Sequence, residues 1–124
     1  MMDRDPLTEK LIGCAIEVHR HLGPGLLESA YEQCMIHEMT TQRVPFRSQV
    51  PLPVQYKGFH LDCGYRLDIL AAEQVIVELK SVEKMTGLHE AQLLTYMKLA
   101  GIGRGLLINF NAQRLVDGVR RFKI

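Results

Sequence analysis

Two apolar runs that lie close together in the chain, residues 65–70 and 75–80, constrain the fold more than any other feature. Both runs are rich in leucine, isoleucine and valine, and β-branched residues favour strands. Gly64 precedes the first run, and the polar pair Glu73-Gln74 separates it from the second. Two such runs joined by a short polar break are typical of a β-hairpin. We therefore expect this hairpin to form the centre of a sheet around which the other elements are arranged.

Three charged residues of this hairpin are predicted to share one face. If the chain reverses at Glu73, Asp68 lies directly opposite Glu78 on the neighbouring strand. Side chains alternate along a strand, so Glu78 and Lys80 share a face and Leu79 takes the other. Charges left unpaired on a core strand would be costly. Two interpretations follow: a cross-strand ion pair on a solvated face, or a site where two carboxylates and an ammonium group act together.

Length and composition indicate one domain, residues 1–124, with a single core. The chain is 47% hydrophobic and 23% charged, and its formal net charge of +1 means that any basic surface must be local. No apolar run is long enough to span a membrane, and the polar N-terminus does not look like a signal peptide. The three cysteines form no CxxC pair and no zinc-binding spacing, which predicts reduced thiols and a cytoplasmic location.

Two helices are expected before the hairpin. Asp5-Pro6 is typical of an N-cap followed by proline at the first helical position, and apolar residues then recur at helical spacing to residue 22. The Gly23-Pro24-Gly25 sequence ends this helix. A second helix is expected from about residue 26 to about residue 41. Glu28 falls in its first turn, where the helix dipole favours a carboxylate.

The segment between the second helix and the hairpin is expected to contain two strands. Residues 43–48 are interpreted as a polar connection, and residues 50–56 alternate apolar side chains with prolines 51 and 53. Proline cannot donate a ladder hydrogen bond, so residues 50–56 are predicted to form an edge strand. Lys57-Gly58 is a tight-turn signal, after which residues 59–63 return as the next strand.

A third helix is predicted after the hairpin, over residues 88–100, with Gly101 as its end. Gln92 and Tyr96 fall on its otherwise apolar stripe. A glutamine amide in such a place needs a hydrogen-bonding partner. The pattern therefore brings a polar group toward the sheet that this helix covers.

The last two strands complete the predicted sheet. Residues 105–110 are almost wholly apolar and follow a β-α-β crossover, so they are expected to pair in parallel with residues 75–80. Residues 115–124 are expected to add an edge strand protected by basic side chains. The predicted fold class is therefore α/β (α+β), with a mixed central sheet flanked by helices and the order ααββββαββ.

Charged and polar residues follow one another along these elements in a definite order: Glu28, Asp68, Glu78, Lys80, Gln92 and Tyr96. This ordered set resembles the PD-(D/E)XK nuclease superfamily. Residues 25–31 also match the GxxExxY pattern that names one family of its small members. The resemblance extends from about residue 7 to about residue 122 and implies a restriction-endonuclease-like core. Leu67 stands where the superfamily's eponymous proline would be, a departure shared by many members.

The resemblance implies a metal-dependent nuclease that acts on DNA or, alternatively, on RNA. Phosphodiester hydrolysis requires a neutralised phosphoryl charge and an activated water molecule, and a hard divalent cation with oxygen ligands supplies both. We expect Asp68 and Glu78 to hold Mg²⁺ or Mn²⁺, with the Leu79 carbonyl as a further ligand. Lys80 is expected to orient or deprotonate the attacking water and to stabilise developing negative charge.

Five residues outside the hairpin receive predicted roles, each with a structural alternative. Glu28 is expected to act as an outer metal ligand, although a carboxylate at a helix start is also stabilised by the dipole alone. Gln92 is expected to orient a phosphate oxygen or the lysine, or else to satisfy a backbone group. Tyr96 and Tyr31 are predicted substrate-binding residues. His19 is a further candidate metal ligand, or a histidine that lies near a helix cap.

Two other functional classes remain open at the level of sequence. The first is a catalytically silent module of the same fold that binds nucleic acid or protein. The second is a surface ion-pair cluster of Asp68, Glu78 and Lys80, worth about 1 kcal/mol or less per pair. A metal titration separates this cluster from a metal site, because a bound cation raises the melting temperature by mass action. A homodimer is also predicted as possible, through the proline-bearing edge strand or the C-terminal tail.

Overall fold

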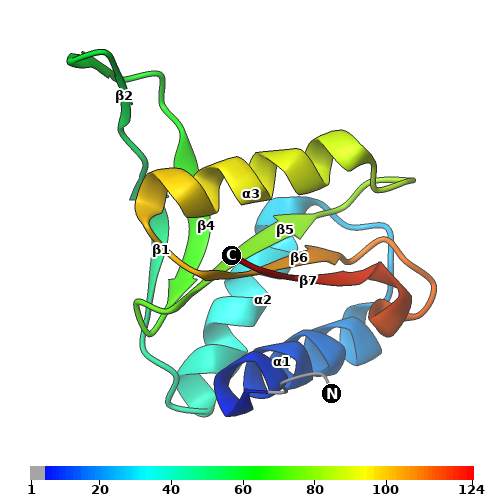
Figure 1. Ribbon diagram of the computed structural model, residues 1–124. Helices are drawn as coiled ribbons and strands as arrows, with labels where there is room; N and C mark the ends of the chain where they lie inside the picture. Colours follow the sequence, from blue (N-terminus) through cyan, green and yellow to red (C-terminus); the bar gives the residue numbers. More distant parts are fainter. Residues whose placement is uncertain (1–4) are drawn as a thin grey trace.

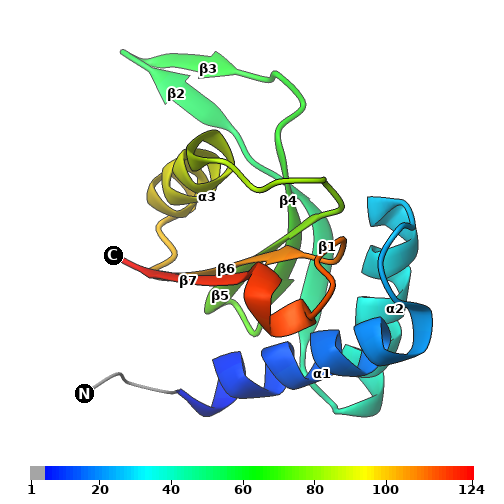
Figure 2. The ribbon, with the colours of Figure 1, turned by 90° about the vertical axis from the view of Figure 1, so that its right-hand side faces the viewer.

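The computed structural model describes residues 5–124 as a five-stranded mixed sheet with helices on both faces (Figures 1 and 2). Residues 1–4 of the predicted domain lie outside the described part. The elements along the chain are α1 (Pro6–Leu22), α2 (Glu28–Thr41), β1 (Phe46–Pro51), β2 (Val54–Tyr56), β3 (Phe59–Leu61), β4 (Arg66–Ala71), β5 (Val75–Lys80), α3 (Gly87–Ala100), β6 (Arg104–Asn109), the 3₁₀ helix η1 (Leu115–Gly118) and β7 (Val119–Lys123).

The sheet has the strand order β1-β4-β5-β6-β7. The predicted central hairpin is confirmed, because β4 and β5 are antiparallel and Ile69, Leu70 and Ala71 pair with Val77, Ile76 and Val75. This register places the reversal at Glu73. The predicted crossover is also confirmed, since α3 leads from β5 to β6 and these two strands are parallel. The fold class predicted from the sequence, a mixed sheet flanked by helices, is therefore correct.

The prediction for residues 43–56 was wrong in one respect. The structure divides the expected single edge strand in two: β1 starts at Phe46, inside the predicted connection, and forms the sheet edge, while β2 pairs only with β3. The physical reason is the pair of prolines, neither of which has an N–H for a ladder. Leu52 between them is buried and its N–H donates to the Tyr65 carbonyl, and there the paired strand ends. Five strands therefore precede α3 where four were expected.

The predicted helix caps and turns are confirmed. Asp5 caps α1, with its Oδ1 accepting a hydrogen bond from the Thr8 amide at 2.8 Å. Gly101 ends α3 with φ 69° and ψ 30°, the left-handed conformation that glycine adopts without strain. At the tip of the β2–β3 hairpin both Lys57 and Gly58 have positive φ, as in the turns that suit a two-residue loop. α2 begins at Glu28, two residues later than expected.

Each face of the sheet has its own core. The helices α1 and α2 cover one face, and α3 covers the other (Figure 2). Buried residues of the first core include Leu11, Tyr31, Met35, Val77, Leu79, Ile108 and Phe110. Buried residues of the second core include Leu52, Leu67, Ile76, Leu93, Met97 and Leu107. Strand β5 contributes alternate residues to both cores, which explains why its sequence is apolar almost throughout.

The C-terminal strand β7 is an edge strand, as predicted, but is shorter than expected because η1 precedes it. Its exposed Arg120 and Arg121 are charges of the kind that discourage pairing with another sheet edge. Arg121 also forms an ion pair with Glu9 of α1 at 3.1 Å. None of the helices in residues 5–124 is long and apolar enough to cross a membrane.

The close approach of η1 to the end of β6 leads to a testable substitution at Gly118. A Cβ atom there would lie 2.4 Å from the Asn109 carbonyl oxygen, a backbone atom that cannot move aside cheaply. We expect Gly118→Ala to lower the free energy of unfolding by about 1–3 kcal/mol, measured by urea denaturation. Gly13→Ala is the matched control, because Gly13 is an exposed position of α1 and no atom lies within 4 Å of a Cβ placed there. We expect this substitution to raise the free energy of unfolding by about 1 kcal/mol. Equal effects of the two substitutions would contradict this packing.

Candidate active site

The candidate site lies where the regular pairing of β4 with β5 ends. Beyond the Ile69–Val77 pair, the next residues along the two strands are Asp68 and Glu78, opposite one another as the sequence predicts. The Asp68 amide donates to Oε1 of Glu78 at 3.0 Å, and the Leu79 amide donates to Oδ2 of Asp68 at 2.9 Å. Each carboxylate is therefore held by a backbone N–H of the opposite strand, which orients both groups without any flexible side-chain partner.

The neighbouring edge strand is irregular at the same level. Gln49 of β1 has φ 51°, a left-handed conformation that non-glycine residues rarely adopt. In β4, Leu67 packs in the α3-side core while Ile69, two residues later, packs in the core of α1 and α2. Residues two apart in a regular strand share a face, so the strand is distorted at Asp68. Local distortions of this kind re-aim side chains, and they are common beside active sites.

Glu78 is a buried carboxylate, with 4% of its surface exposed. The pKa of Glu78 is raised from its ordinary value of 4.5 to about 8, first by burial and then by the negative charge of Asp68, while the hydrogen bond from the Asp68 amide and the charge of Lys80 oppose the change. Two carboxylates this close cannot both be ionised cheaply without a compensating positive charge. The pair is thus suited to holding a proton or a cation, and destabilises the fold when neither is present.

Lys80 contacts α3. Its Nζ donates to Oε1 of Gln92 at 3.3 Å, so the amide that needed a partner on the apolar stripe is satisfied by the lysine. Within residues 5–124, no ion pair of 4 Å or less joins Lys80 to Asp68 or Glu78. The alternative of a surface ion-pair cluster therefore fails on two grounds, the burial of Glu78 and the amide partner of Lys80.

Tyr96 lies on the same side of the sheet, one helical turn after Gln92. Its pKa is raised by burial and by the negative charges of Glu78 and Asp68, which places the phenol near both carboxylates. Its ring also meets Tyr65, with ring centroids 6.1 Å apart and planes inclined by 60°. The structure therefore brings Asp68, Glu78, Lys80, Gln92 and Tyr96 together.

Three hydrogen bonds hold the short loop before α2: two link it to Tyr31 of α2, and one links it to Ser81 at the end of β5. The Tyr31 hydroxyl donates to the Gly23 carbonyl at 2.6 Å and accepts from the Leu26 amide at 3.1 Å. The hydroxyl of Ser81, the residue after Lys80, donates to the Leu26 carbonyl. Glu28 follows two residues later and is exposed to solvent. These contacts position Glu28 as the first residue of the helix next to the site.

The placement of Tyr31 does not support the predicted substrate contact. The side chain is fully buried, and its ring stacks on Phe110 with centroids 4.5 Å apart. Its hydroxyl is already used by the loop before α2. A side chain enclosed in this way shapes the loop that carries Glu28 and has no surface left for a substrate.

Sequence reasoning missed Glu32, which lies near the site. Burial raises the pKa of Glu32, and the charges of Asp68 and Glu28 add to the effect, so its carboxylate is close to both. The Gln49 amide donates to Oε1 of Glu32 at 2.8 Å, which links it to the distorted edge strand. The i,i+4 spacing from Glu28 on one helix face was the available signal.

His19 is not brought into the carboxylate cluster. Its Nε2 lies 2.8 Å from the Ala112 carbonyl oxygen, in the loop after β6. Among residues 5–124 no three His, Cys, Asp or Glu side chains converge closely enough to hold a metal ion. The buried Asn109, also missed from the sequence, orders the loop after β5: its Oδ1 accepts from the Val82 amide and its Nδ2 donates to the Val82 carbonyl.

The donor set fits a hard cation bound by oxygen atoms. Asp68 and Glu78 supply carboxylates, and the Leu79 carbonyl lies between Glu78 and Lys80 in sequence. Mg²⁺ and Mn²⁺ prefer such ligands and commonly keep several waters, so two protein carboxylates suffice. Glu28 and Glu32 are then available as outer carboxylates. The raised pKa of Glu78 agrees with this, because a bound cation would supply the positive charge that the pair lacks.

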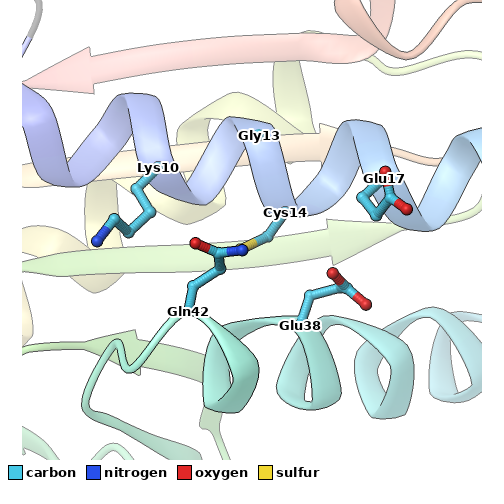
Figure 3. A pocket seen from close by; sticks show the side chains of 6 residues that line it. All are labelled: Lys10, Gly13, Cys14, Glu17, Glu38 and Gln42. Atoms are coloured by element: carbon cyan, nitrogen blue, oxygen red, sulfur yellow. The ribbon is translucent and has the colours of Figure 1, made fainter.

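A pocket separate from the carboxylate site lies between α1 and α2, with a volume of about 420 Å³ (Figure 3). Lys10, Cys14 and Glu17 approach it from α1, and Glu38 and Gln42 approach it from α2. It shares no residue with the carboxylate cluster. Burial raises the pKa of the Cys14 thiol, which makes a poor nucleophile of it. This pocket therefore offers no competing catalytic centre.

Comparison with known proteins gives one finding and two negative results. A family model described as the PD-(D/E)XK nuclease superfamily matches residues 5–122, nearly the whole chain. Searches of curated proteins and of solved structures found no match. The matched residues span all of the elements that form the site. The narrower GxxExxY assignment stays a prediction.

The buried Glu78 carboxylate predicts how the stability of the metal-free protein depends on pH. Unfolded Glu78 loses its proton near pH 4.5, whereas the folded protein retains it up to about pH 8. The folded state thus binds more protons within this interval, so stability falls as pH rises from about 4.5 to about 8. We expect the melting temperature of the wild type in EDTA to fall more steeply over this range than that of Glu78→Gln. Identical pH profiles would show that Glu78 is not the titrating group.

The loop before α2 gives a separate prediction about Tyr31. Tyr31→Phe keeps the stacked ring but leaves the Gly23 carbonyl and the Leu26 amide without the hydroxyl. We expect unfolding free energy to fall by about 1–3 kcal/mol in urea denaturation. Tyr56→Phe is the matched control, because that ring is 58% exposed, and it should change stability by less than about 0.5 kcal/mol. A Tyr31→Phe protein as stable as the control would mean that the tether contributes nothing.

Proposed function

The chain belongs to the PD-(D/E)XK nuclease superfamily, and from that premise we propose that it is a divalent-metal-dependent nuclease that hydrolyses phosphodiester bonds of DNA. The observation that carries the proposal is the backbone-anchored Asp68–Glu78 pair beside Lys80, in which Glu78 is buried and Asp68 is half-buried. A fold gains nothing from placing a carboxylate with a strongly raised pKa next to another one. Such arrangements are characteristic of functional sites.

Asp68, Glu78 and the Leu79 carbonyl would hold the cation, Mg²⁺ or Mn²⁺. When bound, such an ion would neutralise charge on the phosphoryl oxygens and lower the pKa of a water ligand. The two amides that donate to Asp68 and Glu78 keep both carboxylates in position before any ion arrives. This arrangement limits the rearrangement needed for binding, which is the usual advantage of a preorganised site.

Lys80 and Gln92 would serve the attacking water. The ammonium group is half-buried and held by the Gln92 amide oxygen, so its position is set by α3 as well as by β5. From there Lys80 would orient the water, accept its proton or stabilise the developing negative charge. Glu28, and Glu32 beside it, would act as outer carboxylates at the start of α2. Tyr96 would contact the substrate next to the carboxylates.

The test is a cleavage assay with single-stranded, double-stranded and branched DNA and with RNA, each in EDTA, Mg²⁺ or Mn²⁺. We expect metal-dependent cleavage that Asp68→Ala and Glu78→Ala each reduce by at least about a hundredfold, with the fold retained by circular dichroism. Asp117→Ala, an exposed carboxylate on η1, is the matched control and should cleave like the wild type.

Each other outcome of this assay points elsewhere. Wild-type cleavage by both variants would show that the site assignment is wrong. Absence of cleavage on every substrate, with no metal bound, would favour the alternative of a silent binding module. Cleavage of RNA but not DNA would correct the substrate and keep the site. A light-scattering mass measured in the same buffer shows whether the active species is one protomer or a homodimer.

A further inference from the structure

An open groove of about 550 Å³ runs along α3 and includes two of the proposed catalytic residues, Lys80 and Gln92. Leu88 and His89, which precede Gln92 on α3, also line it. Leu99, near the end of α3, and Val54 of the β2–β3 ribbon line it as well. Both views show this ribbon projecting from the body beside α3 (Figures 1 and 2). The lining residues are Val54, Tyr65, Lys80, Leu88, His89, Ala91, Gln92, Thr95, Tyr96 and Leu99.

The chemistry of this lining suits nucleobases better than a phosphate backbone. It contains no carboxylate, one ammonium group and one imidazole, with aliphatic and aromatic side chains making up most of the rest. Binding a duplex requires several cations along two phosphate strands, whereas Lys80 is the one lysine or arginine among the residues that line the groove. Unpaired bases instead present flat, apolar faces that stack on aromatic rings.

Two tyrosines frame the groove close to the carboxylates. Tyr65 is 45% exposed, and its inclined contact with Tyr96 leaves much of its ring open to solvent. Tyr96 in turn lies near Glu78 and Asp68, whose charges add to the effect of burial in raising its pKa. A base stacked on Tyr65 would therefore lie next to Tyr96, the ring of the groove that is near both carboxylates.

The aromatic surface continues along the ribbon. Val54 pairs with Leu61, and Tyr56 pairs with Phe59, so these four side chains share one face of the two-stranded ribbon. Val54 lines the groove, which means that this face adjoins it. Tyr56 is 58% exposed and Phe59 is 69% exposed. An isolated hairpin is marginally stable, and leaving its aromatic face uncovered is a feature of binding surfaces.

A cation accompanies these rings at the ribbon tip. The Lys57 ammonium lies 5.4 Å from the centre of the Tyr56 ring. The combination of stacking rings with nearby positive charge is the arrangement by which proteins hold single strands without reading their sequence. With Lys80 in the groove, the surface combines two ammonium groups with exposed aromatic faces.

We propose that the α3 groove and the β2–β3 ribbon bind one unpaired strand of nucleic acid, with bases stacked on Tyr65 and on the Tyr56–Phe59 pair. The strand then leads its phosphodiester to Asp68, Glu78 and Lys80. Cleavage of the bound strand rests on the proposed function, whereas binding of the strand does not. A duplex is excluded from the surface because its bases are already stacked and paired.

The test measures binding without cleavage, by fluorescence anisotropy of wild-type protein in EDTA. The probes are a labelled single-stranded oligonucleotide, its duplex, and a single strand of equal length that carries abasic sites. We expect the ordinary single strand to bind at least tenfold more tightly than either of the others. The Tyr56→Leu/Phe59→Leu double variant should raise Kd for the single strand at least tenfold, about 1.4 kcal/mol.

The controls separate stacking from general hydrophobicity and from damage to the fold. Leucine keeps an apolar side chain but has no aromatic face, and Tyr56→Phe keeps the face, so Tyr56→Phe should bind like the wild type. Ile16→Ala alters an exposed apolar residue of α1 on the opposite helical layer and should leave Kd unchanged. Unchanged melting temperatures would show that the ribbon variants remain folded.

Several results would overturn the inference. Equal affinity for the abasic and ordinary strands, preference for duplex, or unaltered Kd in the leucine double variant would each do so. Concentration-dependent dimers that the double variant abolishes, with nucleic-acid binding unchanged, would identify the ribbon as a self-association surface. Single-strand binding without metal-dependent cleavage would uphold this inference and reject the proposed nuclease. Cleavage without single-strand preference would do the reverse.

Discussion

Asp68 and Glu78 accept hydrogen bonds from backbone amides of each other's strands, at the level where the regular β4–β5 pairing gives way. The rest of the site depends on this exchange, because it holds the buried Glu78 carboxylate beside the half-buried carboxylate of Asp68. A carboxylate with so little exposure is stable only when protonated or when a positive charge compensates it. The elements around the pair hold the two carboxylates in place and position Lys80, Gln92 and Glu28 near them.

Three elements place further groups around the carboxylate pair: α3, the loop before α2 and the β2–β3 ribbon. The β5-α3-β6 crossover places α3 over the face that carries Lys80, so Gln92 meets the ammonium group. On the other side, Tyr31 and Ser81 hold the loop before α2 against the end of β5, and this sets the position of Glu28. The ribbon arises because prolines interrupt the edge strand, and its aromatic face then adjoins the groove that contains Lys80 and Gln92.

The central features of the fold and site could be predicted because they follow from alternation and local turn chemistry. The reversal at Glu73 sets which residue faces Glu78, and period-two alternation sets the face of Lys80. Gln92 could be singled out because an amide on an apolar helix stripe requires a partner. Each of these inferences involves neighbours in sequence or one hairpin register.

Other features depend on contacts between distant elements, which no local pattern encodes. Tyr31 was expected to bind substrate, but its side chain is buried and its ring stacks on Phe110. Glu32 lies near the site and accepts a hydrogen bond from Gln49, a residue in the left-handed conformation beside the distorted β4 strand. The split of residues 46–56 into two strands was missed. The prolines indicate an edge strand, but they do not by themselves indicate where its pairing stops.

The most direct test of the account is the binding of Mn²⁺ to the protein, measured by electron paramagnetic resonance as loss of the free-ion signal. We predict saturable Mn²⁺ binding to the wild type, competed by Mg²⁺, that Glu78→Gln and Asp68→Asn each abolish. Glu73→Gln, which alters an exposed carboxylate at the tip of the same hairpin, should bind like the wild type. Absence of saturable binding, or equal binding in Glu78→Gln, would contradict the claim that this carboxylate pair is a metal site.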